Sequence, residues 1–388
     1  MSLNIEYYLG NYGNEHWGPV MADRVALFVG TDKGAFVLTS DMARARWDVS
    51  GPHMRGSSID HMIFDGRDGT MFMAINHFIY GPEVARSTDF GETWEKAEKQ
   101  PRFEEGSGRV MEKLWNVQPG RDSEPGVVYL GAAPASLWRS EDSGVTWHEN
   151  AELQGVPGRD KWMPGAGGLC LHTILLDPSN PDRMAVSISA AGYFRSGDGG
   201  KTWVRKTDGL PLGEAPAGFE DLAVEYAGEA DHCVHKMAVD AGDAAVQYMQ
   251  HHMGVFRTGD FGDSWEKIED GLPESFGFPI VTHPRKSGHV WLIPNHSGEF
   301  RSASSGAFRV FKSERGGDSW RALTDGLPQE NAYLSTLRES MAVDGADPVG
   351  VYVGAKSGVL YGSRDEGESW YEVASSLPPI LSVEAALV

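Results

Sequence analysis

The sequence predicts an all-β fold, a seven-bladed β-propeller whose blades are four-stranded antiparallel sheets. Three observations predict it. An eight-residue phrase that ends in tryptophan occurs seven times, strand-like runs precede it in successive units, and the end of the chain supplies a strand that the first unit lacks. Repeats of this length indicate units that bury their apolar faces against one another rather than in one large core.

The repeated phrase follows the pattern Ser-x-Asp-x-Gly-x-Thr-Trp, with Ser and Thr interchangeable. Full copies lie at 87–94, 140–147, 196–203, 258–265 and 363–370. A degenerate copy at 313–320 has Arg315 in place of the aspartate, and a weaker copy at 40–47 has lost the glycine. The closing residues are Trp47, Trp94, Trp147, Trp203, Trp265, Trp320 and Trp370. Successive members of this series are 47 to 62 residues apart, so the chain holds seven similar units.

The composition of the phrase explains what it does. Aspartate and hydroxyl side chains accept hydrogen bonds from nearby backbone N–H groups and so hold a tight turn. Glycine adopts the positive φ that such a turn requires. The tryptophan then begins the next strand, and its ring packs between neighbouring sheets. We therefore interpret the aspartate as structural, although its position resembles that of a catalytic acid.

Each unit contains four strand-like runs, with the repeated turn between the third and the fourth. In the third unit, for example, 127–130 precedes 136–139, and in other units an apolar run ending in aspartate lies further upstream, as at 172–177. Four-stranded sheets repeated around an axis are typical of propellers. We expect one domain at 23–388, with blades at about 24–48 plus 379–388, 56–98, 110–150, 168–206, 232–268, 277–323 and 333–374.

The first unit begins at Val25 with its second strand, so its first strand is missing. Three later units carry Asp-Gly-Leu-Pro after their fourth strand, and 376–378 matches the end of that phrase. The segment 379–388 therefore stands where a first strand is expected. We predict that it completes blade 1 and removes the open edges of the ring. Residues 1–22 are left over, and their aromatic side chains predict an N-terminal extension packed on the ring.

Charge and composition restrict the partners. The formal net charge is −21, from 55 acidic and 34 basic residues, and such a chain repels nucleic acid and anionic lipid, so we expect neither as a partner. The chain has two cysteines, no signal-peptide pattern at its start and no apolar run that approaches a membrane span. A cytoplasmic protein with a small-molecule substrate is the simplest interpretation.

The repeated phrase resembles the Asp box of the BNR-repeat propeller superfamily, and the resemblance covers nearly the whole chain. That superfamily includes sialidases, xyloglucan-cleaving glycosidases, sortilin-type receptors and photosystem II assembly factors. The resemblance implies the fold more strongly than the activity, because one propeller hosts many functions. Sialidases of this kind carry an Arg-Ile-Pro near the first blade, whereas this chain has Arg24-Val25-Ala26 there. The departure argues against a true sialidase.

Chemistry is expected at one end of the central funnel, where the first strands start and the second-to-third loops open. Nine of the 13 histidines fall in these positions: His53, His61, His77, His172, His232, His235, His251, His252 and His296. The predicted catalytic residues are His172, His235, Asp60, His61 and Glu339. The predicted substrate-binding residues are Arg55, His77, Tyr80, Trp115, Tyr193, His251, His252, His296 and Arg338. Histidine can transfer protons near neutral pH, carboxylates can assist it, and arginine can hold an anion.

A metal centre is the alternative interpretation of the histidines. Cys170-Leu-His172 and Cys233-Val-His235 stand at the same distance from the aspartate that ends each strand. Imidazole and thiolate ligands suit transition metals such as zinc, copper, iron or nickel. On this interpretation the cofactor is a transition metal, His172 and His235 are ligands, and His251, or alternatively His252 or His296, completes the set. The opposing interpretation is repeat inheritance, with hydrogen-bonded histidines and small buried cysteines filling the funnel.

The leading hypothesis is an enzyme, with histidine as base, that acts on a small polar or anionic sugar or acid by hydrolysis or elimination. The competing hypothesis is a binding or assembly scaffold without turnover. Apolar and aromatic residues across the funnel face would favour the scaffold, and clustered titratable groups favour the enzyme. The long connection 212–231 is expected to form a short helix over the funnel mouth, since loops of this length are often functional.

Overall fold

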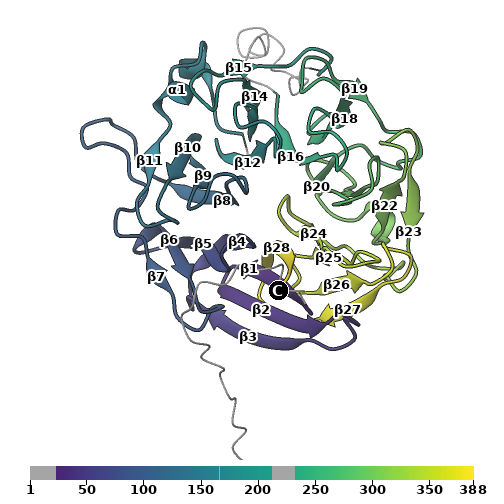
Figure 1. The fold of residues 1–388 in the computed structure, drawn as a ribbon. Helices are drawn as coiled ribbons and strands as arrows, with labels where there is room; N and C mark the ends of the chain where they lie inside the picture. The colour runs from purple at the N-terminus through teal and green to yellow at the C-terminus, as the bar shows by residue number, and fades with distance from the viewer. Residues whose placement is uncertain (1–22, 166, 212–231) are drawn as a thin grey trace, which may run out of the picture.

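The structure, a computed structural model, describes residues 23–165, 167–211 and 232–388. Its strands form seven four-stranded antiparallel sheets that are arranged radially around a central axis (Figure 1). This arrangement confirms the predicted seven-bladed all-β propeller. The expected N-terminal extension (1–22) and the expected helix over the funnel (212–231) lie outside the described residues.

The first blade joins the two ends of the described chain. Its four strands, in spatial order, are β28 (Ile380–Leu387), β1 (Arg24–Thr31), β2 (Gly34–Asp41) and β3 (Asp48–His53). Strand β28 pairs antiparallel with β1, with Leu387 opposite Val25 and Ile380 opposite Thr31. The C-terminal segment therefore closes the ring, as predicted, and β3 extends to His53, past the expected end of this blade at residue 48.

The other six blades each consist of four strands that are consecutive in the chain. The second and third blades consist of β4 (Ser58–Asp65), β5 (Thr70–His77), β6 (Gly81–Ser87), β7 (Glu95–Lys96), β8 (Lys113–Pro119), β9 (Val128–Ala133), β10 (Ser136–Ser140) and β11 (His148–Glu149). The fourth and fifth consist of β12 (Leu171–Leu176), β13 (Met184–Ile188), β14 (Gly192–Ser196), β15 (Val204–Arg205), β16 (Val234–Val239), β17 (Gln247–His251), β18 (Gly254–Thr258) and β19 (Glu266–Lys267). The sixth and seventh consist of β20 (Gly277–Thr282), β21 (Val290–Pro294), β22 (Val310–Ser313), β23 (Arg321–Leu323), β24 (Met341–Val343), β25 (Val351–Gly354), β26 (Leu360–Ser363) and β27 (Tyr371–Ala374).

Helical structure in the described chain is short. It comprises α1 (Ala151–Gln154) and two 3-10 turns, η1 (Arg159–Lys161) and η2 (Ser304–Gly306), all in connections between strands. Asn150 caps α1 by accepting a hydrogen bond from the Leu153 N–H, which satisfies one donor of the first turn. Across the described ranges, none of the helices is long and apolar enough to cross a membrane.

The repeated turns are held by the hydrogen bonds that their composition predicts. In the second blade the Ser87 hydroxyl accepts from the Gly91 N–H at 2.8 Å, and the Asp89 carboxylate accepts from the Thr93 N–H at 2.9 Å. Gly91 has a φ of 89°, the left-handed region that glycine favours. Bonds from the side chains of Thr93 and Ser87 and from the Thr93 backbone lower the pKa of Asp89 to about 2. The aspartates of these turns are therefore structural, as interpreted.

The apolar cores lie between neighbouring blades, with one cluster at each of the seven interfaces. The tryptophans that close the turns contribute to them, and Trp147 is 1% exposed among side chains of the second and third blades. The prediction that Tyr193 binds substrate is wrong. Its ring is fully buried between the fourth and fifth blades, 5.3 Å from the ring of Trp265, because it alternates onto the blade face rather than the funnel.

A β-bulge interrupts the first strand of most blades at the same place. The register shifts once in each of β4, β8, β12 and β16, and the extra residues are Asp60, Trp115, His172 and His235. Similar shifts occur in β20 and β28. A bulge bends its strand and redirects a side chain. Because the bulge recurs at the same place in successive blades, the redirected side chains lie near the axis.

Candidate functional site

Charged side chains from four blades meet around the axis. Lys236 of β16 forms an ion pair with Glu339, which lies two residues before the start of β24. The Oε2 atom of Glu339 lies 4.0 Å from Nε2 of His61 on β4, and that same nitrogen lies 3.0 Å from Oε1 of Glu384 on β28. Residues more than 300 positions apart are thus neighbours, because each blade contributes its first strand to the axis.

The hydrogen bonds around His61 identify the nitrogen that carries its proton. The Val117 N–H donates to Nδ1 at 3.3 Å, so the neutral ring carries its proton on Nε2 and donates it to Glu384. The side chain of Glu384 is 30% exposed and that of Glu339 is 3% exposed. The His61 nitrogen and one oxygen of each carboxylate all lie within 4.8 Å of one another. This group can exchange protons with a bound molecule.

A cavity of about 380 Å³ follows the axis between the first strands. Lys236 and Glu384 are its charged lining residues, and the rest of the wall is apolar or neutral. Cavities of this size hold small molecules, with a few polar groups that fix their orientation. Glu384 thus connects the His61 group to a space of the size of a sugar.

Arg338 lies beside this group, close to the axis, and is 8% exposed. Its Nη1 atom is 3.4 Å from the sulfur of Cys170, and its guanidinium stands over the ring of Trp115 at 5.1 Å. Within the part of the chain that the structure describes, Arg338 pairs with no carboxylate. A nearly buried positive charge without an anionic partner is suited to hold an anion.

Asp60 is engaged in a different way. Its carboxylate pairs with Lys113 at 2.6 Å and accepts a hydrogen bond from the Asn76 amide at 2.6 Å. Lys113 in turn stands 4.3 Å above the ring of Trp115. Asp60 therefore positions Lys113 and, through it, the indole that Arg338 contacts.

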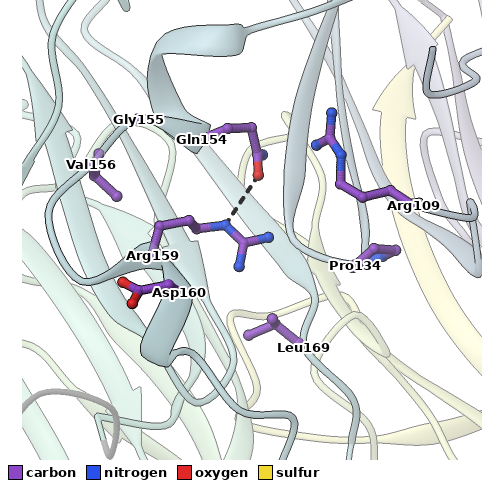
Figure 2. A pocket seen from close by; sticks show the side chains of 8 residues that line it. All are labelled: Arg109, Pro134, Gln154, Gly155, Val156, Arg159, Asp160 and Leu169. Atoms are coloured by element: carbon purple, nitrogen blue, oxygen red, sulfur yellow. Dashed lines mark hydrogen bonds between the residues drawn. The ribbon is translucent and has the colours of Figure 1, made fainter. Parts of the chain in front are cut away.

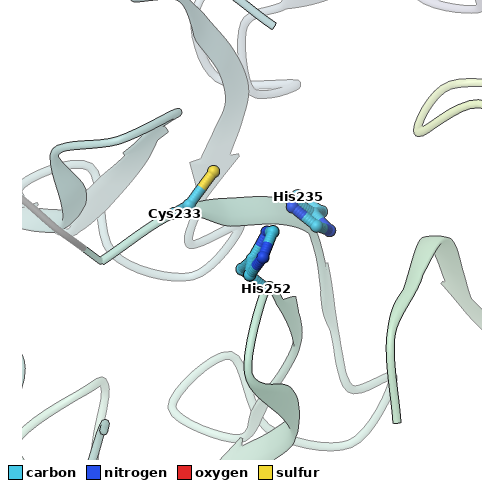
Figure 3. Close-up of side chains that lie close together, drawn as sticks. All are labelled: Cys233, His235 and His252. Carbon is cyan, nitrogen blue, oxygen red and sulfur yellow. The ribbon is translucent and has the colours of Figure 1, made fainter. Parts of the chain in front are cut away.

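Cys233, His235 and His252 form a second group on the fifth blade (Figure 3). One potential ligand atom from each lies within 4.8 Å of the other two. Burial raises the pKa of the Cys233 thiol, but its contacts with His235 and His252 outweigh burial and bring that pKa well below its usual value. Burial lowers the pKa of His235.

Two of the three predicted metal ligands lie outside this group. Both ring nitrogens of His172 are used, since Nε2–H donates to the Val234 carbonyl at 2.9 Å and Nδ1 accepts from the Thr173 hydroxyl at 2.9 Å. His251 is fully buried, accepts from the Met253 N–H and packs against Phe256. His172 therefore has no free nitrogen, either to bind a metal or to act as the predicted base, and both predictions are wrong for it. The Nε2 atom of His251 is buried without a hydrogen-bond partner among the described residues, and His251 is not part of this group.

The remaining predicted residues lie on the rim of the funnel. His77 accepts hydrogen bonds from the Ile79 and Tyr80 N–H groups, and its ring packs against Tyr80 at 4.6 Å. His296 pairs with Glu274 at 3.4 Å. Arg55 is exposed in the turn between β3 and β4. The structure thus separates these rim residues from the groups at the axis.

A further pocket of about 620 Å³ opens beside the third and fourth blades (Figure 2). Arg109 and Arg159 approach it from two different segments. Arg109 is neutralised by a bidentate pair with Glu149, at 2.6 and 2.7 Å. Arg159 donates to the Gln154 side chain at 3.0 Å and stands over the ring of Trp162. Arg109, Arg159 and Asp160 are its charged lining residues, and both arginines are already engaged by neighbouring side chains.

Sequence reasoning missed two residues of the axial group, Lys236 and Glu384. Glu384 lies on the C-terminal strand that the sequence assigned to blade 1, so its place near the axis could have been deduced. Lys236 follows His235 directly, and alternation places neighbours on opposite faces of a strand. The bulge at His235 breaks that alternation, and no sequence signal reveals it.

Comparisons with known proteins agree with the fold. No family model matches the chain. The xyloglucanase Xgh74A of Acetivibrio thermocellus is 32% identical over 149 residues, which cover 34% of this chain and 17% of that protein. The chain thus corresponds to less than a fifth of this curated relative.

Solved structures with the same fold cover more of the chain. A GH74 xyloglucanase from Xanthomonas campestris superimposes with a TM-score of 0.56 at 16% identity, over 93% of this chain and 52% of that one. YCF48 bound to D1 peptide superimposes with a TM-score of 0.52 at 14% identity, over 82% of this chain and 81% of that one. The chain is a seven-bladed β-propeller with neighbours in both groups. The relatives matched by sequence are named xyloglucanases.

Proposed function

We propose that this chain is a glycosidase-like hydrolase that binds a small anionic sugar or acid near the axis. The observation that carries the proposal is Arg338, a nearly buried guanidinium with no carboxylate partner among the described residues, in a chain of net charge −21. An anionic substrate supplies the missing partner, and the ring of Trp115 supplies an apolar face for the sugar. The partial similarity to xyloglucanases supports the hydrolytic chemistry.

Glu339 and Glu384 are the proposed acid–base pair. Glycosidases of the retaining kind hold two carboxyl groups about 5–5.5 Å apart. The oxygens of Glu339 and Glu384 lie within 4.8 Å, and Oε1 of Glu339 is buried without a hydrogen-bond partner in the described ranges. Glu384 lines the axial cavity and His61 holds it in place. We also propose a cytoplasmic location, because both cysteines are free and disulfides are rare in that compartment.

Binding of glucuronate and hydrolysis of 4-nitrophenyl glucuronide test this proposal, with glucose and the glucoside as neutral probes. We expect Arg338→Met to weaken glucuronate binding by about 10- to 100-fold, the value of a charge-assisted hydrogen bond. Arg46→Met, which removes an exposed arginine in the turn between β2 and β3, is the matched control. Glu384→Gln should abolish hydrolysis and preserve binding. Equal binding of glucose and glucuronate, or unchanged binding by Arg338→Met, contradicts the proposal.

A scaffold is the second candidate, and the rim favours it. Among the described residues, seven of the eleven exposed large apolar side chains lie in funnel-side connections: Phe78, Ile79, Tyr80, Val110, Met163, Phe300 and Tyr333. Exposed apolar groups gathered on one face mark a binding surface. The neighbour YCF48 has been solved with a peptide bound. If the protein binds an extended peptide through this rim and turns over none of the glycosides, the scaffold is the better assignment.

A further inference from the structure

We propose that Cys233, His235 and His252 form a three-ligand site for a borderline-soft divalent metal ion, with zinc as the expected occupant and a fourth position open to the funnel. Thiolate and imidazole are the ligands that zinc prefers. The inference concerns metal binding alone and does not depend on the proposed hydrolase function.

The frame of the site is rigid. Cys233 directly precedes β16, His235 is the bulged residue of that strand, and His252 directly follows β17. The His252 N–H donates to the Cys233 carbonyl at 2.9 Å, which fixes the two ends side by side. The rings of His235 and His252 lie 5.4 Å apart. The strand ends therefore bring the three side chains together before any metal arrives.

The partner of His235 leaves one nitrogen available to a metal. Its Nδ1–H donates to the Gly277 carbonyl at 2.6 Å, so Nε2 keeps its lone pair. A histidine ligand that donates its other N–H to a backbone carbonyl is the usual arrangement around zinc. Phe276 and Phe278 pack against the same imidazole at 5.1 and 4.7 Å and give the site an apolar wall.

The preceding blade has the same backbone frame without the site. There Cys170 and His172 stand where Cys233 and His235 stand, and the Ser189 N–H donates to the Cys170 carbonyl as His252 does to Cys233. His172 also bonds a carbonyl of the next blade, but its second nitrogen accepts from Thr173. The fourth blade thus lacks the third ligand and the free nitrogen, so repeat inheritance does not explain the group on the fifth.

The geometry requires little movement to bind zinc. Tetrahedral bonds of about 2.0–2.3 Å place ligand atoms about 3.3–3.8 Å apart. The present separations reach at most 4.8 Å, and the exposed side chain of His252 can rotate inward. Because the described residues of this group supply three donors, a fourth position faces the funnel, as in zinc sites that bind water or substrate.

Cobalt titration of the chelator-treated full chain tests the site, with zinc competition to give the zinc affinity. We expect one equivalent of Co²⁺ and a thiolate-to-metal charge-transfer band. Cys233→Ser should abolish that band, and His252→Asn should weaken zinc binding by more than the about 10- to 100-fold cost of losing an outer-shell partner.

Cys170→Ser is the matched control and should retain both the band and the affinity. His252 is exposed, so His252→Asn keeps the fold even if Cys233→Ser does not. The proposal is overturned if the wild-type chain binds no equivalent of either metal, if the band persists in Cys233→Ser, or if His252→Asn binds zinc as tightly as the wild type.

Discussion

At the scale of single residues, the hydrogen-bond partners of a histidine decide what it can do. His172 and His235 occupy equivalent bulges and each donates to a carbonyl of the following blade. His172 uses Nε2 for this bond and His235 uses Nδ1, so different nitrogens remain. The remaining nitrogen of His172 accepts a hydrogen bond from Thr173, whereas the remaining nitrogen of His235 faces Cys233 and His252.

The buried histidines also make stability depend on pH. Burial, reinforced by Arg205, lowers the pKa of His232 to about 4, and burial also brings the pKa values of His172 and His251 well below 6.5. The folded chain keeps these rings neutral while the unfolded chain takes up protons below about pH 6.5. Their contribution is therefore present above pH 6.5 and is lost as the pH falls toward 4.

Urea unfolding at pH 7.5 and pH 5.5 measures this effect. Each such histidine costs up to about 1.4 kcal/mol for each pH unit below 6.5, so the wild-type free energy of unfolding should fall across the interval. His232→Asn should show a smaller fall, whatever its stability at pH 7.5. An identical pH dependence in the two proteins would contradict the assignment of His232 as a buried neutral ring.

At the scale of elements, the repeated turn is a modular structure with two imperfect copies, at 40–47 and at 313–320. In the full copies the aspartate accepts from the backbone and hydroxyl four residues later, as Asp365 does from Ser369 at 2.9 and 2.5 Å. At 313–320 the Ser313 hydroxyl still accepts from the Gly317 N–H at 2.8 Å, but Arg315 replaces the aspartate. The sixth blade therefore keeps two of the five hydrogen bonds that a full copy makes.

Arg315→Asp should restore the hydrogen bonds that the aspartate makes in the full copies. Ser319 stands where Ser369 stands in the last copy, so the new carboxylate can accept from its N–H and hydroxyl. We expect the free energy of unfolding to rise by about 0.5–1.5 kcal/mol, the net value of one hydrogen bond. Arg315→Ala removes the arginine without adding an acceptor and serves as the control. If both variants unfold at the same urea concentration, the restored bonds contribute nothing.

At the scale of the whole molecule, the ring depends on one strand far from the rest of its blade in sequence. Strand β28 pairs with the whole length of β1 and carries Glu384 to the axis. Without it β1 would present an unpaired edge, and such edges promote association between chains. The same strand thus contributes to closure and to the candidate site.

Deletion of residues 379–388 should cost the chain its cooperative unfolding and produce oligomers in size-exclusion chromatography. Glu384→Gln keeps the strand and should remain folded like the wild type, which separates closure from the side chain at the axis. A deletion variant that stays monomeric and unfolds at the wild-type temperature would show that the ring does not need this strand.

The order and number of the blades followed from the sequence because the turn phrase is local. Its hydrogen bonds join residues four or fewer positions apart, so each copy predicts a blade independently of the rest of the chain. The closing strand followed for a related reason, since Pro378 ends the same phrase that precedes first strands elsewhere. His61, Glu339 and Arg338 were found near the axis because like positions in the blades converge there.

Only the tertiary structure decided how the convergent residues are paired. Lys236 meets Glu339 across 103 positions, and a bulge that the sequence does not reveal brings it there. The tertiary structure also places the Tyr193 ring in the core between the fourth and fifth blades. It leaves a free nitrogen on His235 but not on His172. A repeat specifies its backbone through short-range bonds, whereas the use of each side chain depends on which atom of the neighbouring blade it meets.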